Sequence, residues 1–301
     1  NHHIGCGSPA NYTTLVDLAD LHERVIRGYL GAQREPFYSI FASGFYGSYY
    51  AEGYLKNVID QEAAKVGLTT AQRTSFVNAM RVLGKKGGYA VSLGYHRAWA
   101  AYVSLPVWVN GGMSQWEYAT GAFVNNASNE TKAIDAAATG AAEVLRDEIH
   151  AAMLTLKNHV FGSLTSFGSS CQGSLSPAFV HSVSGTPEIG QTLTYTAKAT
   201  RRNNTVGMFY IGVSKTGWGR TPLPFHLDFM GAPGCYLRVS PDFGLSLPCV
   251  AGVCGVSARI PVDSKLIGQS LHTQFFIADT GANAANLIGT NGVTTTLGGQ
   301  Q

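Results

Sequence analysis

The residues best suited to catalysis or metal binding are histidines and acids, and the first two histidines lie at the start of the chain. The sequence begins Asn1-His2-His3. A free amine at Asn1, two deprotonated amides and the His3 imidazole would offer four nitrogens in a plane, the geometry that Cu(II) prefers. A histidine in third place is common by chance, so the motif permits copper without requiring it.

The other candidate acids and bases lie in the first half of the chain. His150 and His159 fall on one predicted helix, together with Asp147, and His96 and Glu117 belong to an aromatic stretch. An enzyme housed here would need a cleft that collects His96, Glu117 or Asp147. The simpler interpretations are a solvated helix face for His150 and Asp147, and a half-buried histidine at His96.

We do not expect an enzyme, because the usual motifs are missing. The sequence has no Gly-x-Ser-x-Gly elbow, no His-Glu-x-x-His and no phosphate-binding loop, and Cys6 has no neighbouring base. Turn signals of the second half contain four aspartates: Asp228, Asp242, Asp263 and Asp279. Two of these could hold calcium, a cation that prefers oxygen ligands, although Asp is favoured in turns for its bonds to backbone. No cofactor is therefore required.

Helices predicted in the first half would position these groups. From Thr13 to Leu30, leucines and other apolar residues recur at three- and four-residue spacing. Thr69 and Gln72 form a capping box at the start of a second helix. Gly87-Gly88 then breaks the chain before residues 89–103, which are apolar nearly all round and must be enclosed by this domain or by neighbouring subunits.

The longest predicted helix runs from Glu130 to His159. Its apolar residues step by three and four, and at 1.5 Å per residue the helix would measure about 45 Å. Small alanines along this seam would let a partner helix approach closely. An ordinary bundle helix explains the seam, and an intermolecular contact is the alternative.

Residues 38–50 are dense in Tyr, Phe, Gly and Ser. Tyrosines among small residues are typical of contact loops, because they offer a large, rigid surface at low entropic cost, but buried packing explains them equally well. The candidate contact residues are Tyr46, Tyr49 and Tyr50, with Trp218 in the second half.

A Gly- and Ser-rich stretch over residues 162–176 predicts the boundary between domains 1–165 and 166–301. Beyond it, short alternating segments are separated by turn signals. The predicted strands are Gln191–Ala197, Val206–Val213, Tyr236–Val239, Val256–Ile260, Leu271–Ile277 and Val293–Leu297. We therefore predict an α+β chain, with a mainly helical domain followed by an all-β sandwich of immunoglobulin-like or jelly-roll-like type.

Composition narrows the class of protein. Only 13% of residues are charged, well below the usual quarter, and the net charge of +3 comes from scattered basic residues, so nucleic acid is not an expected partner. No apolar run is long enough to span a membrane. The start of the chain, which contains no signal peptide, reads as a mature end left after cleavage, although a truncated chain would begin in the same way.

Cysteine usage indicates an oxidising compartment. Four of the five cysteines lie in the β half, and none forms a Cys-x-x-Cys pair. Cys249 and Cys254 could close a small loop across a turn. Cys171 with Cys235 is our preferred second bridge among several arrangements that remain open. Cys6 would then be left for a partner on another chain or as a buried free thiol.

The second half resembles a C-terminal β module of planctomycete-type secreted proteins over about residues 168–298. The matching motifs follow in order: Pro187-Glu-Ile-Gly190 with Leu193, Ile211-Gly-Val-Ser214, Pro222 to Cys235 with its Gly-Ala-Pro-Gly-Cys turn, Ile260-Pro-Val-Asp263, Asp279-Thr-Gly-Ala-Asn283 and Leu287 to Gly292.

This resemblance implies an exported, disulfide-stapled accessory β module and carries over no activity to this chain. It also implies that the first cysteine pairs with the cysteine of the Gly-Ala-Pro-Gly-Cys turn. The sequence departs from the family at Ser170, where glycine is usual, and the Cys249/Cys254 pair is an addition. Residues 1–167 carry no such resemblance.

Three functions are compatible with these patterns. The preferred hypothesis is an exported structural protein, extracellular or on the cell surface, that associates with itself into filaments, tubes or a surface layer. The second is a secreted protein that binds carbohydrate or a cell surface, with Trp218, Tyr210 or Tyr236 stacking on a sugar. The third is a secreted enzyme whose site lies in the helical half.

Overall fold

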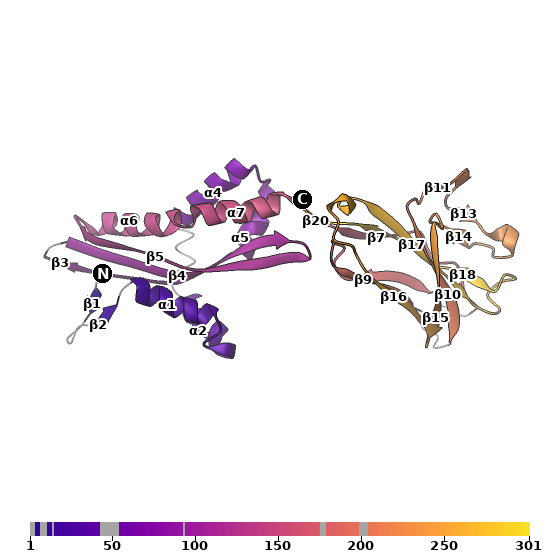
Figure 1. The fold of residues 1–301 in the computed structure, drawn as a ribbon, viewed down its shortest axis with the longest axis horizontal. Coiled ribbons are helices and arrows are strands. Elements are labelled where there is room, and N and C mark those ends of the chain that lie inside the picture. Colours follow the sequence, from indigo (N-terminus) through magenta and orange to yellow (C-terminus); the bar gives the residue numbers. More distant parts are fainter. Residues whose placement is uncertain are drawn as a thin grey trace. The chain divides into compact units, whose positions relative to one another are not determined.

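The computed structural model describes residues 4–6, 11–13, 15–42, 54–92, 94–174, 179–198 and 204–301. They divide into two units, Asn1–Trp108 with Met113–Asn158 and Val109–Gly112 with His159–Gln301. Each unit has its own apolar core. Helices and strands are both abundant, so the chain is α+β (Figure 1).

The first unit is built around a three-stranded sheet that the sequence analysis did not predict. Its strands, in spatial order, are β3 (Arg81–Val91), β4 (Gly94–Val109) and β5 (Gly112–Ala127). The expected mainly helical domain is therefore a helix-and-sheet unit. Gly87 and Gly88 lie within β3 and do not break the chain, because β3 pairs continuously with β4 along its whole length.

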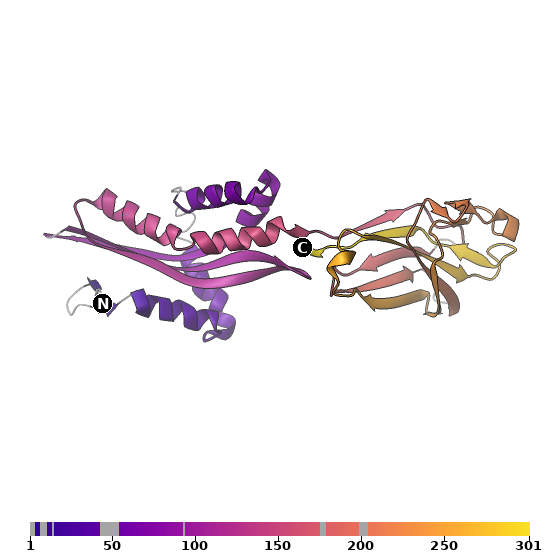
Figure 2. The same ribbon diagram turned by 45° about the horizontal axis from the view of Figure 1, so that its top comes forward.

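Helices cover both faces of this sheet (Figure 2). On one face lie α4 (Tyr54–Val66), α5 (Thr70–Ala79), α6 (Glu130–Glu143) and α7 (Arg146–Lys157). On the other face lie α1 (Leu15–Ile26) and α2 (Arg34–Ala42), which are linked by a 3₁₀ turn (Gly31–Gln33). A small hairpin of β1 (Ile4–Cys6) and β2 (Asn11–Thr13) precedes α1.

The apolar stretch predicted over residues 89–103 lies mainly in the central strand β4. Residues 98–108 of β4 are all buried, with Trp99 and Val103 facing the α6 side and Tyr102 facing α2. A strand covered on both faces reads as a continuous apolar run instead of an alternating one. This explains why the period-two signal of a strand is absent there.

The helix predicted over residues 130–159 is wrong as one element. It divides at Val144 and Leu145, where the Leu145 N–H bonds the Ala142 carbonyl three residues back in place of the usual four. Ala141 and Leu145 before the break, and Ile149 and Leu156 after it, are all buried against the sheet. Both helices therefore pack in one core with the sheet, and the alanine seam packs within its own unit.

Local sequence accounts for the helix starts. The Thr69 hydroxyl accepts from the Gln72 N–H and the Gln72 side chain accepts from the Thr69 N–H, which confirms the predicted capping box. Asn129 caps α6 by accepting from the Lys132 N–H at 2.8 Å.

The second unit is an antiparallel sheet with small hairpins at its margins. The main sheet has the order β7-β19-β17-β10-β15-β16-β9-β8, and β18 also pairs with β17. The strands of the main sheet are β7 (Ser163–Phe167), β8 (Val180–Ser184), β9 (Thr192–Lys198), β10 (Thr205–Gly212), β15 (Phe243–Val250), β16 (Val253–Arg259), β17 (Ser270–Ala278), β18 (Leu287–Gly289) and β19 (Gly292–Thr296). The marginal strands are β6 (His159–Val160), β11 (Gly217–Trp218), β12 (Thr221–Pro222), β13 (Phe225–His226), β14 (Tyr236–Leu237) and β20 (Gly299–Gln300), with 3₁₀ turns at Asp228–Met230 and Ser264–Leu266.

The sheet curls until its ends meet. Asn291, next to β19, accepts from the His181 N–H of β8 at 2.8 Å and donates to the His181 carbonyl at 3.0 Å. His181 itself is buried against Phe275 and bonds Thr273 Oγ1 at 2.8 Å. Apolar side chains, including Phe209 and Phe275, fill the enclosed space.

Each of the six strands predicted in the second half is present within a few residues of its expected ends. Strands β7 and β8 were not predicted, and neither was β15, which contains Pro248 and has mostly exposed side chains, so that its alternation is weak. The second unit also begins at His159, before the expected boundary, since the Ser-containing strand β7 pairs with β19.

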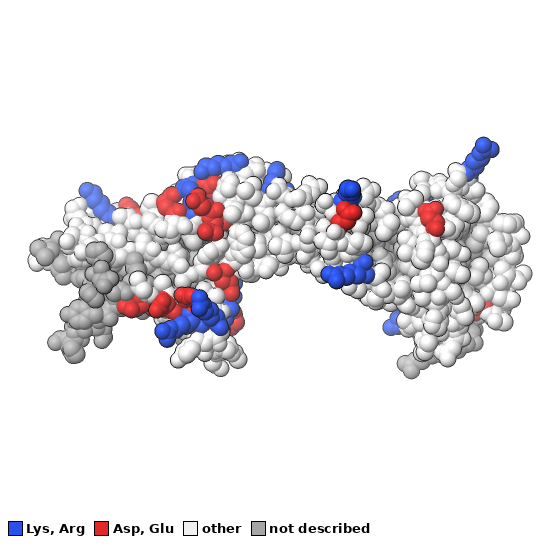
Figure 3. All heavy atoms as spheres, viewed as in Figure 1, with Lys and Arg blue, Asp and Glu red and all other residues white. Residues whose placement is uncertain are grey.

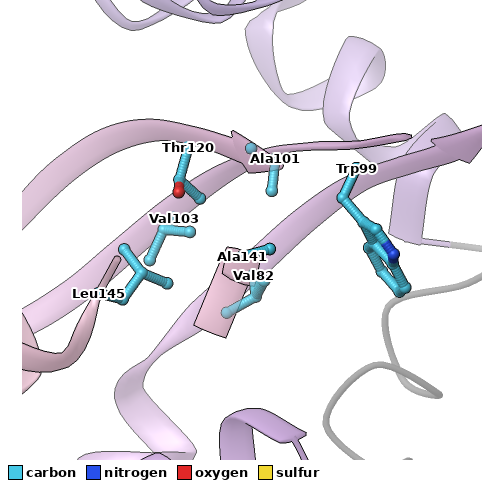
Figure 4. A pocket seen from close by; sticks show the side chains of 8 residues that line it. Val82, Trp99, Ala101, Val103, Thr120, Ala141 and Leu145 are labelled. Atoms are coloured by element: carbon cyan, nitrogen blue, oxygen red, sulfur yellow. The ribbon is translucent and has the colours of Figure 1, made fainter. Parts of the chain in front are cut away.

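A small void lies between the first sheet and α6 (Figure 4). It measures about 10 Å³, and its lining is apolar apart from Thr120, whose buried Oγ1 has no hydrogen-bond partner among the described residues. Gly121 brings β5 close to β4 here, because a Cβ at this position would lie 2.4 Å from the Trp99 carbonyl oxygen.

We predict that Thr120→Val stabilises the first unit by about 1 kcal/mol, because it removes a buried hydroxyl without a partner and keeps the β-branched shape. Thr155→Val is the matched control. Its Oγ1 accepts from the Trp108 N–H at 2.9 Å, so the same change should cost about 1–2 kcal/mol. Urea unfolding followed by tryptophan fluorescence measures both, and a loss of stability in Thr120→Val would contradict the prediction.

Candidate interaction surface

The four cysteines of the second unit are joined in pairs. Cys171 is bonded to Cys235, and Cys249 to Cys254, its cross-strand partner at the β15–β16 turn. The first bridge ties the segment before β8 to the end of the Gly231–Cys235 turn. In that turn Gly231 and Gly234 adopt φ of 79° and 73°, conformations that favour glycine.

Several sequence candidates lie outside the part of the chain that the structure describes. These are Asn1, His2 and His3 of the copper motif and the contact candidates Tyr46, Tyr49 and Tyr50. Cys6 lies in β1, and its side chain is also outside the described part.

The aromatic residues proposed for sugar stacking have different surroundings. Trp218 is 47% exposed on the short strand β11. Tyr210 is half-buried on β10 and meets Phe276 edge-on, while Tyr236 contacts the ring of His226 and lies beneath the Arg238 guanidinium. The described ring contacts do not join these three aromatics into one platform.

The four turn aspartates each bond neighbouring backbone. Asp228 accepts from the Gly234 N–H, Asp242 from Val213, Asp263 from Lys265 and Asp279 from Ser174, all at 2.9 Å. The bonds of Asp228 and Asp263 are the local kind that favours Asp in turns, whereas those of Asp242 and Asp279 join segments far apart in the sequence. Among the described residues, no group of three or more His, Cys, Asp or Glu side chains could hold a metal ion.

The candidate acids and bases of the first half, Glu117, Asp147 and His159, do not lie together in one site. Glu117 pairs with Arg34 and accepts from the Tyr102 hydroxyl at 2.5 Å, on the α2 side of the sheet. Asp147 is exposed on α7, which covers the other face. His159 lies beyond the end of α7, in β6, where it is buried and bonds Glu188 at 3.0 Å.

His150 does not lie on a merely solvated face, as the sequence suggested. Its Nδ1 is 2.9 Å from Oε2 of Glu62, a residue of α4 that is only 2% exposed. Lys65 and Arg146 donate to the other Glu62 oxygen. The sequence analysis missed this cluster, because Glu62 and Arg146 are far apart in the chain and no local pattern relates them.

The Glu62 cluster is suited to holding α4 on α7. Burial alone would raise the pKa of Glu62, but the hydrogen bonds from Lys65, Arg146 and His150 outweigh it and bring the pKa down to about 2. A general base works best with a pKa near the working pH, so this carboxylate is poorly suited to proton transfer. Its charge is instead neutralised by the cations around it.

The strand β5 forms one edge of the sheet of the first unit. The sheet order ends with β5, and no strand among the described residues pairs with its outer side. The strand is sixteen residues long and contains no Lys, Arg or Pro, and its only charged residue is Glu117. Natural sheets usually protect such an edge with charge, proline, a bulge or a covering element.

An open hollow of about 350 Å³ adjoins this edge. It is lined by Gln115, Trp116, Glu117 and Tyr118 of β5 and by Glu148 of α7. The Tyr118 hydroxyl donates to Glu148 at 2.8 Å, and its burial raises the tyrosine pKa. Trp116 is 38% exposed. The hollow is shallow and its two acids already have partners, so it offers contact surface more than a reaction chamber.

Charge is unevenly distributed over the surface. In the face shown in Figure 3, acidic and basic side chains gather over the helices of the first unit and leave wide areas without either. Residues 159–301 show few charges in the same view.

No family model, curated protein or solved structure matches this chain. None of the helices that the structure describes combines the length and hydropathy needed to cross a membrane.

We predict that Glu62→Gln destabilises the first unit by about 3–5 kcal/mol at neutral pH, because Arg146 and Lys65 lose their buried counter-charge. The pKa of Glu62 is lowered from 4.5 to about 2 by folding, so its contribution is present above pH 4.5 and is lost as pH falls toward 2. The variant should therefore lose less stability than the native chain over this range.

Urea unfolding at several pH values, followed by tryptophan fluorescence, tests the Glu62 prediction. Glu143→Gln is the matched control, because Glu143 also pairs with Arg146 but is exposed. Its effect should stay below about 1 kcal/mol. Equal pH dependence in the native chain and in Glu62→Gln would contradict the role assigned to Glu62.

Proposed function

We propose that this protein is an exported structural protein that associates with itself into an extracellular assembly. The observation that carries the proposal is the outer edge of β5, a strand of sixteen residues almost without charge that has no strand partner there within the described part of the chain. Such an edge is a template for another strand, and a protein that does not protect it is suited to being completed by a partner.

Export is supported by the disulfides. The bridges Cys171–Cys235 and Cys249–Cys254 persist most readily in an oxidising compartment, as outside the cell. We propose further that the second unit is the β-sandwich module of planctomycete-type secreted proteins, with Cys171–Cys235 as its staple. In this view the second unit is an accessory module and the first supplies the contact.

The low charge of the chain favours association between its copies. Only 13% of the residues are charged and the net charge is +3, so mutual repulsion between copies is weak. Exposed apolar side chains such as Met113 and Trp116 lie on β5 itself. These features suit a surface that faces other protein.

Light scattering coupled to size separation tests the proposal. The full chain, produced in an oxidising compartment, should give species heavier than the 31.9 kDa monomer, in a proportion that rises with concentration. Cys6→Ser should behave in the same way, since strand pairing does not need a disulfide between copies. A single 31.9 kDa species at every concentration would disprove self-association.

A further inference from the structure

We infer that β5 pairs with β5 of a second copy, antiparallel, about a twofold axis that passes through Thr120. This inference rests on the proposed self-association and names the surface responsible for it. The occupant is a second copy of this chain, because the edge is self-complementary in side-chain size and charge.

The two edges of the first sheet differ in chemistry. At one edge, β3 carries Arg81, Lys85 and Lys86 in its sequence, and positive charges discourage the addition of a strand. At the other edge, β5 carries no positive charge. The edge available for pairing is therefore β5.

Symmetry restricts how two β5 strands can meet. A twofold axis perpendicular to the sheet makes the strands antiparallel and presents the same patch from each copy. Opposed residues must then point to the same face, so their positions along the strand differ by an even number and one residue lies on the axis. The register is defined by naming that residue.

With Thr120 on the axis, large side chains oppose small ones. Tyr118 lies opposite Ala122 of the second copy and Trp116 opposite Val124, all on the face covered by α4 to α7, where Tyr118, Ala122 and Val124 already pack on the core. Aromatic and β-branched residues form favourable cross-strand pairs. On the other face, the amide Gln115 meets the amide Asn125.

The same register separates the charges of β5 and uses its extended part. The two Glu117 residues lie six positions apart, about 20 Å at 3.4 Å per residue, so their repulsion is small. Residues 115–125 of each copy, which precede the left-handed Asn126 (φ 56°), overlap, which allows about ten new backbone hydrogen bonds.

Directed cross-linking tests the pairing, with every variant carrying Cys6→Ser. Copies with Gln115→Cys and copies with Asn125→Cys are co-expressed under different tags and oxidised. A covalent dimer that contains both tags is expected from the mixture, and none from either variant alone, since each cysteine is about 34 Å from its own counterpart. Co-expression of Ser114→Cys with Asn125→Cys is the mismatched control, because these residues point to opposite faces.

Thr120→Cys provides a second measurement that needs no mixing. Residue 120 of one copy lies opposite residue 120 of the other, so this variant alone should form a covalent dimer. It replaces a hydroxyl that has no hydrogen-bond partner among the described residues, which keeps the change mild.

The outcomes separate this inference from the proposed function. Assembly by light scattering without any cross-link from these variants overturns the β5 interface and leaves self-association standing. A cross-link between Ser114→Cys and Val124→Cys copies overturns the Thr120 axis, because that pair belongs to a register centred on Ala119. A chain that stays monomeric overturns both.

Discussion

The requirement that backbone groups in a sheet be paired determines the form of the first unit. Its central strand β4 meets this requirement on both sides and is buried on both faces, with Trp99 under the helices α4 to α7 and Tyr102 under α1 and α2. The helices cover that strand: buried alanines of α6 belong to the same core as Trp99, and the Glu62 cluster holds α4 against α7. Among the described residues, the outer sides of β3 and β5 are left without a strand, and of these two edges only β5 has no Lys or Arg.

The second unit satisfies the same requirement in another way. Its sheet curls until Asn291 joins the region of β19 to β8, so the ends of the sheet approach each other. Two disulfides then fix the turn before β14 and the β15–β16 hairpin. The contrast between a sheet that closes on itself and one that ends at an open strand underlies the assignment of contact to the first unit and of an accessory role to the second.

The sequence predicted local features better than distant ones. The Thr69 capping box and six strands of the second half follow from patterns within a few residues. The first sheet was missed because β4 is covered on both faces and has no alternation. Glu62 was missed because its partners Arg146 and His150 come from another part of the chain. The open edge of β5 is a property of strand order, which no local pattern reveals.

The central claim, that another copy completes the β5 edge, is tested most directly by hydrogen–deuterium exchange. Peptides covering Gly112–Ala127 are compared between dilute and assembled protein, with peptides of β3 as an internal reference. The account predicts that amides of β5 gain protection on assembly while those of β3 change little, because only the β5 edge acquires new hydrogen bonds. Assembled protein in which β5 exchanges as fast as in the dilute state would contradict it.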